Sequence, residues 1–405
     1  MPSFSEILQR RTIFRDKDVL SPHYVPDVLP FREGEVEKIM LVLSGALKGM
    51  RAGNLFIYGK TGTGKTCSVR HVMKKFMQME SPAKTVYLNC RIYNSKYKVM
   101  HKIAKEFIPE LEKSGFGISL IYEKLIEWLA GGKIQLIVVL DEIDMVKDLN
   151  ELVYTLVRTN DELLGGGISV VGISNRLSFK EMLDPRSKSS LCETELTFAP
   201  YDAEKMKAIL KQRLEQGFVQ GAVDESALNL AAAIAATESG DARYALRLLL
   251  RAGEIVDAGG GQRIDDSHVE EARRSVEGDM IKEVIQTLPE NQRIVLYAVA
   301  NLSQKGGRYS KLGGNEDGEN FLLSGEVYEE YSRVCNSLCV KKRSARWYRE
   351  YLNELEMLGL ITTIESGRGM RGHTRLIKPG YPAEELKKIV WETMGLEEEG
   401  KKKEK

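Results

Sequence analysis

The chain has 405 residues, 29% of them charged, and a formal net charge of +1. This length predicts two or three domains. No apolar stretch approaches the length of a membrane span, and the basic N-terminus lacks the apolar core of a signal peptide. Five cysteines without a Cys-x-x-Cys pair favour reduced thiols, and five histidines without His-x-x-x-His spacing offer no metal site. We therefore expect a cytoplasmic protein, neither secreted nor embedded in a membrane.

The first predicted strand, Leu55 to Tyr58, is followed by Gly-x-x-x-x-Gly-Lys-Thr, the pattern of a phosphate-binding loop between a strand and a helix. Its glycines let backbone N–H groups point at phosphate oxygens, and the next helix directs its positive dipole end at the same anion. Lys65 is predicted to reach the β- and γ-phosphates, and Thr66 to ligate Mg²⁺. The alternative is a glycine-rich surface turn. The predicted nucleotide contacts here are Gly59, Lys60, Thr61, Gly62, Thr63, Gly64, Lys65 and Thr66.

Two further apolar runs predict buried strands of a parallel sheet. The first, Leu136 to Leu140, ends at Asp141, which we expect to hold Mg²⁺ through water, and at Glu142, which is placed to act as a general base. The second starts at Ile168 and ends at Asn175, whose amide is suited to orient water against the γ-phosphate. Alone, these polar residues are typical of a solvated strand end and a turn. Together with the phosphate loop they predict a nucleotide hydrolase.

Two arginines are candidates for contacts with the phosphates. Asp241 is a predicted helix N-cap, and Arg243 in the first turn after it is expected to lean onto the phosphates. Arg186, in the segment from Leu183 to Leu191, is a candidate to act in trans on nucleotide held by a neighbouring subunit. An ordinary loop arginine is an equally good interpretation of Arg186.

A basic region near the C-terminus predicts a DNA-binding unit. Nine Lys or Arg and four Glu between Lys341 and Lys378 give this region a net charge of +5. A helix is predicted from Ser344 to Leu358, because Tyr348, Tyr351, Leu352, Leu355 and Leu358 recur at helical spacing, and Gly359 is expected to end it. Arg346, Arg349 and Asn353 fall on another face, as base-reading residues would.

Two strands are predicted after this helix, at 360–364 and 374–377, with a glycine-rich tip between them that carries Arg368 and Arg371. Helix, strand, basic tip and strand are the second half of a winged-helix domain. The helix would enter a major groove, and the tip arginines would contact phosphates or a minor groove. A winged helix used for protein contacts is the alternative.

The four nucleotide motifs, in this order and spacing, resemble those of the AAA+ ATPases. The flanks resemble more closely the archaeal replication initiators, the single-chain relatives of the eukaryotic origin recognition complex and of the cell-division-cycle-six loader. Tyr24-Val25-Pro26-Asp27 and Leu29-Pro30-Phe31-Arg32-Glu33 are similar to that family's adenine-side segment, which implies nucleotide contacts by Val25, Pro26 and Arg32. The family also carries a DNA-inserting element near 106–122, for which Lys113 and Phe116 are the candidates, although a plain surface loop fits nearly as well.

The resemblance implies an α/β fold, with an AAA+ parallel-sheet P-loop domain, a helical lid domain and a winged-helix domain. We expect the base at 1–200, the lid at 201–277, the winged helix at 278–396 and a disordered charged tail at 397–405.

The function implied is that of a DNA replication initiator with slow ATP hydrolysis as its switch. Its expected ligands are ATP or ADP and Mg²⁺, and its expected partners are double-stranded origin DNA, the replicative helicase and other initiator paralogues, at the nucleoid. Two alternatives stay open, a clamp-loader or remodelling motor and a winged-helix transcriptional regulator with a nucleotide-sensing module. A clamp loader would lack the C-terminal wing, and a regulator would lack Glu142 and Arg186 as a working pair.

Overall fold

The computed structural model describes residues 12–113, 115–191, 194–238, 240–307, 321–365 and 375–395. The chain divides into two compact units between Ala272 and Arg273, a boundary that falls within helix α11 (Asp266–Thr287). Within these ranges, no helix is long and apolar enough to cross a membrane.

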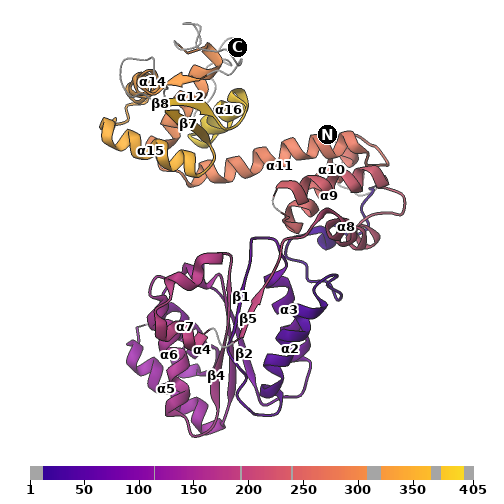
Figure 1. The fold of residues 1–405 in the computed structure, drawn as a ribbon, viewed down its shortest axis with the longest axis vertical. Helices are drawn as coiled ribbons and strands as arrows, with labels where there is room; N and C mark the ends of the chain where they lie inside the picture. The colour runs from indigo at the N-terminus through magenta and orange to yellow at the C-terminus, as the bar shows by residue number, and fades with distance from the viewer. Residues whose placement is uncertain are drawn as a thin grey trace. The chain divides into compact units, whose positions relative to one another are not determined.

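The first unit is built on a parallel five-stranded sheet with the order β2-β3-β4-β1-β5 (Figure 1). Its strands are β1 (Leu55–Tyr58), β2 (Lys84–Asn89), β3 (Gln135–Asp141), β4 (Gly167–Ser174) and β5 (Thr194–Thr197). β3 and β4 are buried along their whole length. Registers between neighbouring strands place Asn89 beside Asp141, Asp141 beside Ile173, and Tyr58 beside Ser174. The carboxyl ends of the central strands therefore meet at one edge, where α/β sheets bind ligands.

Two hydrophobic cores explain why β3 is apolar without interruption. Leu136, Val138 and Leu140 face one core, and Ile137 and Val139 face the other. Figure 1 shows helices on both sides of the sheet. The first core is covered by α4 (Lys96–Phe107), α5 (Ile118–Gly132) and α6 (Leu149–Glu162), and the second by α2 (Glu33–Leu47) and α3 (Lys65–Met77). Helix α7 (Pro185–Leu191) packs against α6. Short 3-10 turns lie at Asp18–Leu20, Pro109–Leu111, Ile143–Met145 and Leu177–Met182.

The remainder of this unit is helical and corresponds to the predicted lid. It contains α8 (Ala203–Gly217), α9 (Glu225–Glu238) and α10 (Ala242–Ala258). The start of the described chain packs here rather than on the sheet, because Phe14 stacks on Phe218 at 4.8 Å and the Ile13 amide donates to Asp257 Oδ1 at 2.9 Å. The domain boundaries expected from the sequence stay predictions.

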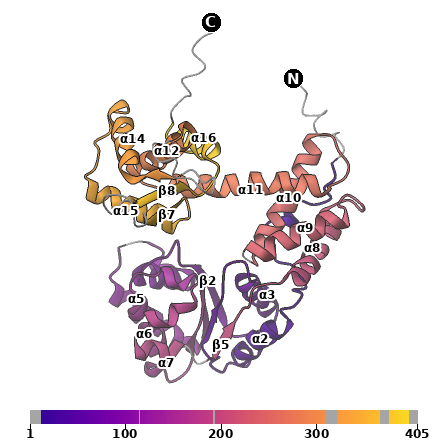
Figure 2. The ribbon, with the colours of Figure 1, turned by 45° about the horizontal axis from the view of Figure 1, so that its top comes forward.

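The second unit is a winged helix, as predicted. Its elements are α12 (Glu290–Lys305), β6 (Leu322–Leu323), α14 (Ser324–Ser337), α15 (Ala345–Met357), β7 (Ile361–Glu365), β8 (Arg375–Pro379) and α16 (Ala383–Thr393) (Figure 2). The strands pair antiparallel in the order β6-β8-β7. Gly359, with φ of +70°, follows Leu358, the C-cap of α15, and so ends the helix as expected. The predicted wing tip with Arg368 and Arg371, and the predicted tail, lie outside the described residues.

Candidate functional site

The phosphate loop joins β1 to α3, as the motif predicts. Gly62 and Gly64 have φ of +69° and +92°, values that favour glycine. The buried Lys65 side chain donates from Nζ to the carbonyl oxygens of Gly59 at 2.7 Å and Lys60 at 2.6 Å. Burial, helped by the nearby Arg243 guanidinium, lowers the pKa of Lys65 to about 8. The loop therefore places the buried Lys65 cation at the N-terminus of α3, an arrangement suited to binding an anion.

Oxygen ligands suitable for Mg²⁺ meet beside this loop. Thr66 Oγ1 donates to both carboxylate oxygens of Asp141, at 3.2 and 3.0 Å, and the Tyr87 hydroxyl donates to the same carboxylate. Asp141 is buried at the end of β3. Burial and this carboxylate raise the pKa of Tyr87 far above its ordinary value. A hydroxyl and a carboxylate side by side fit Mg²⁺, which proteins bind through one or two such ligands plus phosphate oxygens.

The candidate water-activating residues follow the two central strands. Glu142, with φ of +56°, accepts a hydrogen bond from Arg91 Nε, and Asn175 comes directly after β4. Both side chains line the same cleft as the phosphate loop. Sequence reasoning missed Arg91. Its signal was its place just after β2, whose last residue pairs with Asp141.

The lid touches the phosphate loop through the start of α10. Asp241 is the N-cap of α10, as predicted, and its carboxylate accepts from the Arg243 amide at 2.8 Å. The Arg243 guanidinium pairs with that carboxylate at 3.3 and 3.2 Å. The Ala242 amide donates to Gly62 O at 3.3 Å. A Cβ atom at Gly62 would overlap the Asp241 carboxylate, so any larger residue there would displace that carboxylate from its present position.

These elements enclose a cleft of about 280 Å³. The loop from Gly62 to Thr66, Asp141, Glu142, Asn175 and Arg243 line it, and Val25 and Pro26 line it as well. The Pro26 carbonyl is held by His71 Nδ1 of α3 at 3.1 Å. This arrangement can surround a phosphate chain with the backbone amides of the loop and with the cations Lys65 and Arg243. The Glu142 carboxylate lines the same cleft.

Arg32 occupies a different position from the one expected. It is 5% exposed and does not line the cleft. Its guanidinium donates to the Tyr201 hydroxyl at 2.9 Å, to Glu35 Oε1 at 2.6 Å and to the Ala199 carbonyl at 2.5 Å. In this structure Arg32 therefore ties the start of α2 to the connection between base and lid.

Three other predicted site residues of the first unit lie away from the cleft. Arg186 is exposed on α7, with no part in the cleft wall. Lys113 is exposed between Pro109–Leu111 and α5. Phe116 is half-buried and packs against the first core, on the side of the sheet covered by α4 and α5. The structure thus leaves Lys113 accessible to DNA and gives Phe116 a packing role.

In the second unit, α15 presents a polar face as predicted. Arg346 and Arg349 are exposed, while Asn353 is half-buried and accepts from Arg375 Nη1 of β8 at 2.6 Å. Tyr348, Leu352 and Leu355 are buried, but Leu358, expected on the apolar stripe, is 47% exposed because α15 ends before it.

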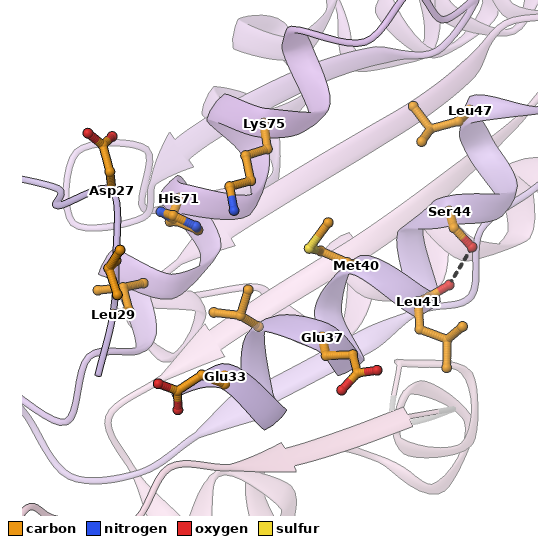
Figure 3. Close-up of a pocket in the computed structure, with 12 residues that line it drawn as sticks. Asp27, Leu29, Glu33, Glu37, Met40, Leu41, Ser44, Leu47, His71 and Lys75 are labelled. Carbon is orange, nitrogen blue, oxygen red and sulfur yellow. Dashed lines mark hydrogen bonds between the residues drawn. The ribbon is translucent and has the colours of Figure 1, made fainter. Parts of the chain in front are cut away.

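A second pocket, of about 600 Å³, lies among α2, α3 and the segment before α2 (Figure 3). Its apolar lining includes Leu29, Met40 and Leu47, and its carboxylates are Asp27, Glu33 and Glu37. Only Lys75 and His71 oppose them. Carboxylates repel phosphate, so this pocket is unsuited to a nucleotide.

Three family models match the chain. They are an AAA domain over residues 48–176, a Cdc6 AAA+ ATPase-type lid domain over 207–274 and a CDC6 C-terminal winged helix domain over 283–389.

Full-length relatives match as well. The ORC1-type DNA replication protein of Pyrococcus abyssi is 40% identical over 385 residues, 93% of this chain and 89% of the relative. ORC1-type DNA replication protein 1 of Methanosarcina mazei is 35% identical over 398 residues, 97% and 94% of the two chains. The solved structure of the Aeropyrum pernix ORC1 protein in complex with DNA aligns with a TM-score of 0.79 and 36% identity over 95% of this chain and 98% of that one. The resemblance inferred from the motifs is confirmed, and the chain belongs to the family of ORC1-type DNA replication proteins.

Proposed function

We propose that this protein is an ATP-dependent replication initiator that binds double-stranded origin DNA and promotes loading of the replicative helicase. The observation that carries the proposal is one cleft lined by the phosphate loop, Asp141, Glu142, Asn175 and Arg243, in a chain that also presents exposed arginines on a winged-helix helix. The relative whose structure was solved in complex with DNA supports the DNA-binding part. The nucleotide acts as a switch, because the lid residue Arg243 and the phosphate loop line the same cleft. Hydrolysis in a single chain is slow, because Arg186 lies outside that cleft.

Each cleft residue has a proposed part in binding or turnover. Lys65 leaves the loop carbonyls and donates to the β- and γ-phosphates. Thr66 and Asp141 would hold Mg²⁺, which would supply positive charge beside the phosphates. Glu142 takes a proton from the attacking water, and Asn175 orients that water. Before it can act, the Glu142 carboxylate must exchange its Arg91 partner for water.

The nucleotide part is tested by two substitutions in the full chain. Lys65→Ala removes a charged hydrogen-bond donor, so ATP affinity should fall by about tenfold to a hundredfold. Glu142→Gln should keep ATP affinity and lower turnover by about 10²-fold or more, because an amide is a poor base. Calorimetric binding and a phosphate-release assay measure the two effects. Unchanged affinity and turnover in both variants would overturn the assignment.

The DNA part is tested by salt-titrated binding to a cognate and a scrambled duplex. Arg346→Ala and Arg349→Ala should reduce discrimination between the duplexes, by about 1–3 kcal/mol for each good base contact. Arg368→Ala and Arg371→Ala should instead lower the slope of log K against log salt by about 0.9 each.

Lys388→Ala on α16, also an exposed cation of the second unit, is the matched control and should change neither quantity. If all four arginine variants behave like Lys388→Ala, the winged helix serves protein contacts. Genome-wide occupancy then separates origins from promoters and so distinguishes an initiator from a transcriptional regulator.

A further inference from the structure

The lid helix α8 brings two side chains with unpaired polar atoms, Gln212 and Arg213, into the cleft wall. Arg213 is 5% exposed, and its Nε and Nη1 atoms are buried with no hydrogen-bond partner. Gln212 Oε1 is likewise buried and has no hydrogen-bond partner. Buried polar groups in folded proteins are almost always paired, and a group that is not calls for a reason such as a ligand.

The surroundings of Arg213 are aromatic and uncharged. Its guanidinium carbon lies 4.7 Å from the centroid of the Tyr24 ring. Burial lowers the pKa of Arg213, and the nearby groups that act against this are Cys67 and Tyr24, neither of which is a carboxylate. The guanidinium is thus fixed by stacking while two of its nitrogens keep their hydrogen-bonding capacity.

The amide of Gln212 has a defined orientation. Its Nε2 donates to the Val28 carbonyl at 3.1 Å, so a flipped amide would set oxygen against oxygen. Gln212 Oε1 is therefore an acceptor without a donor, next in the chain to Arg213, a donor without an acceptor.

Both residues lie on the cleft face of α8. Ile209, Gln212 and Arg213 are spaced i, i+3 and i+4, which places them on one side of a helix, and all three line the cleft. Tyr24, Val25 and Leu246 also line it, and this aromatic and apolar set differs from the charged set at the phosphate loop. A flat, apolar slot with a few oriented polar groups is what a nucleobase requires.

We propose that Gln212 and Arg213 read the nucleobase and select adenine over guanine. Gln212 Oε1 accepts from the exocyclic amine of adenine, and Arg213 donates to a ring nitrogen. Guanine places a carbonyl oxygen where adenine has the amine, so it meets the oxygen of Gln212 instead of a donor. This inference rests on the proposed binding of nucleotide in the same cleft.

The experiment measures equilibrium binding of ADP, GDP and IDP to the full chain by calorimetry. IDP carries the carbonyl but lacks the exocyclic amine of guanine, so relative to ADP it changes only the edge of the base that faces Gln212. The wild-type protein should bind ADP at least about tenfold more tightly than IDP or GDP, a factor that corresponds to one hydrogen bond. Gln212→Met, which keeps the length of the side chain, should bring the ADP to IDP ratio close to one. Arg213→Met should weaken all three nucleotides.

Two controls separate the possible failures. Lys211→Ala, an exposed neighbour on α8, should leave every affinity unchanged. Without nucleotide, Arg213→Met should unfold at the same temperature as the wild type or higher, because it removes an unpaired buried cation, whereas a purely structural arginine would lower it.

The outcomes are distinguishable. If the wild type binds none of the nucleotides, or if Lys65→Ala binds ADP as well as the wild type does, the proposed function fails. If ADP binding depends on Lys65 but the ADP to IDP ratio survives Gln212→Met, or if Arg213→Met keeps its affinities, only the present inference is overturned.

Discussion

Lys65 shows how a binding residue can oppose folding. It is 4% exposed, and its pKa is lowered to about 8 by burial and by Arg243. A lysine whose pKa is lower in the folded protein than in the unfolded chain destabilises the fold at neutral pH, because the folded form binds the proton less tightly. Phosphate oxygens would offset this penalty, so part of the free energy of nucleotide binding would come from compensating the desolvation of the buried Lys65 cation.

This balance predicts a pH dependence in the nucleotide-free protein. Between pH of about 8 and 10.5, the unfolded chain keeps the Lys65 proton and the folded protein has lost it, so raising the pH favours the folded form. Relative to Lys65→Met, the free energy of unfolding of the wild type should rise by at most about 1.4 kcal/mol per pH unit across this window. Denaturant unfolding at several pH values measures it. Lys60→Met, at an exposed loop lysine, should show no such window. A wild-type to Lys65→Met difference that stays constant with pH would refute the explanation.

At the scale of elements, the contact between the phosphate loop and α10 couples the nucleotide to the lid. Asp241 caps α10, pairs with Arg243 and lies against Gly62, so one carboxylate joins the helix terminus, the lid arginine and the loop. A phosphate that attracts Arg243 would loosen this pairing. The carboxylate therefore competes with the nucleotide for the same guanidinium.

Substitution of Gly62 tests that contact. Ala at this position adds a Cβ that overlaps Asp241, in a backbone conformation with φ of +69°. We expect Gly62→Ala to lower the free energy of unfolding by about 1–2 kcal/mol from the left-handed conformation alone, and to weaken ATP binding because α10 can no longer approach the loop. Gly34→Ala in α2 is the matched control, since nothing lies within 4 Å of its added Cβ. It should be neutral or stabilise by up to about 1 kcal/mol. Equal behaviour of the two variants in unfolding and binding would show that the contact contributes nothing.

The elements that sequence patterns predicted are those whose signals are local. The continuous apolar run of β3, the helical stripe of α15 and Gly359 at its end are each encoded within a few residues. The residues whose surroundings were missed depend on partners far along the chain. Arg32 donates to the Tyr201 hydroxyl, 169 positions later in the sequence. Arg213 of the lid stacks on the ring of Tyr24, which lies before helix α2 of the base. Periodicity carries no signal for such pairs.

The same distinction applies within the candidate site. Gly62 to Thr66, Asp141, Glu142, Asn175 and Arg243 were found because each follows a strand or starts a helix, and they do line one cleft. Phe116 was selected because its segment resembles a DNA-inserting element, but in the structure its side chain packs against the hydrophobic core covered by α4 and α5. Nucleotide and DNA binding by these residues stay predictions.

At the scale of the whole molecule, Arg186 lies outside the cleft of its own subunit. It is exposed on α7 while the cleft of its own subunit already contains Lys65, Arg243 and Arg213 as cations. Asp184 accepts from the Ser187 amide at 2.7 Å, which fixes the start of α7 and so presents Arg186 from a short, ordered helix. We infer that its partner is the nucleotide of a neighbouring subunit.

Mixing two variants with different defects tests this inference. An arginine supplied in trans contributes on the order of 10³-fold or more to hydrolysis, so activity should depend on protein concentration. Monomeric wild type and Arg186→Ala should hydrolyse ATP at the same slow rate, and only the wild type should accelerate under conditions that favour assembly.

Glu142→Gln keeps Arg186 but lacks the base, and Arg186→Ala keeps the base. Their mixture should therefore recover part of the wild-type rate, while Lys188→Ala, an exposed lysine on the same helix, should match the wild type throughout. A large loss of activity for Arg186→Ala in a strictly monomeric sample would place the arginine in its own subunit's chemistry or in support of the fold. A mixture no faster than its components would remove it from the shared site.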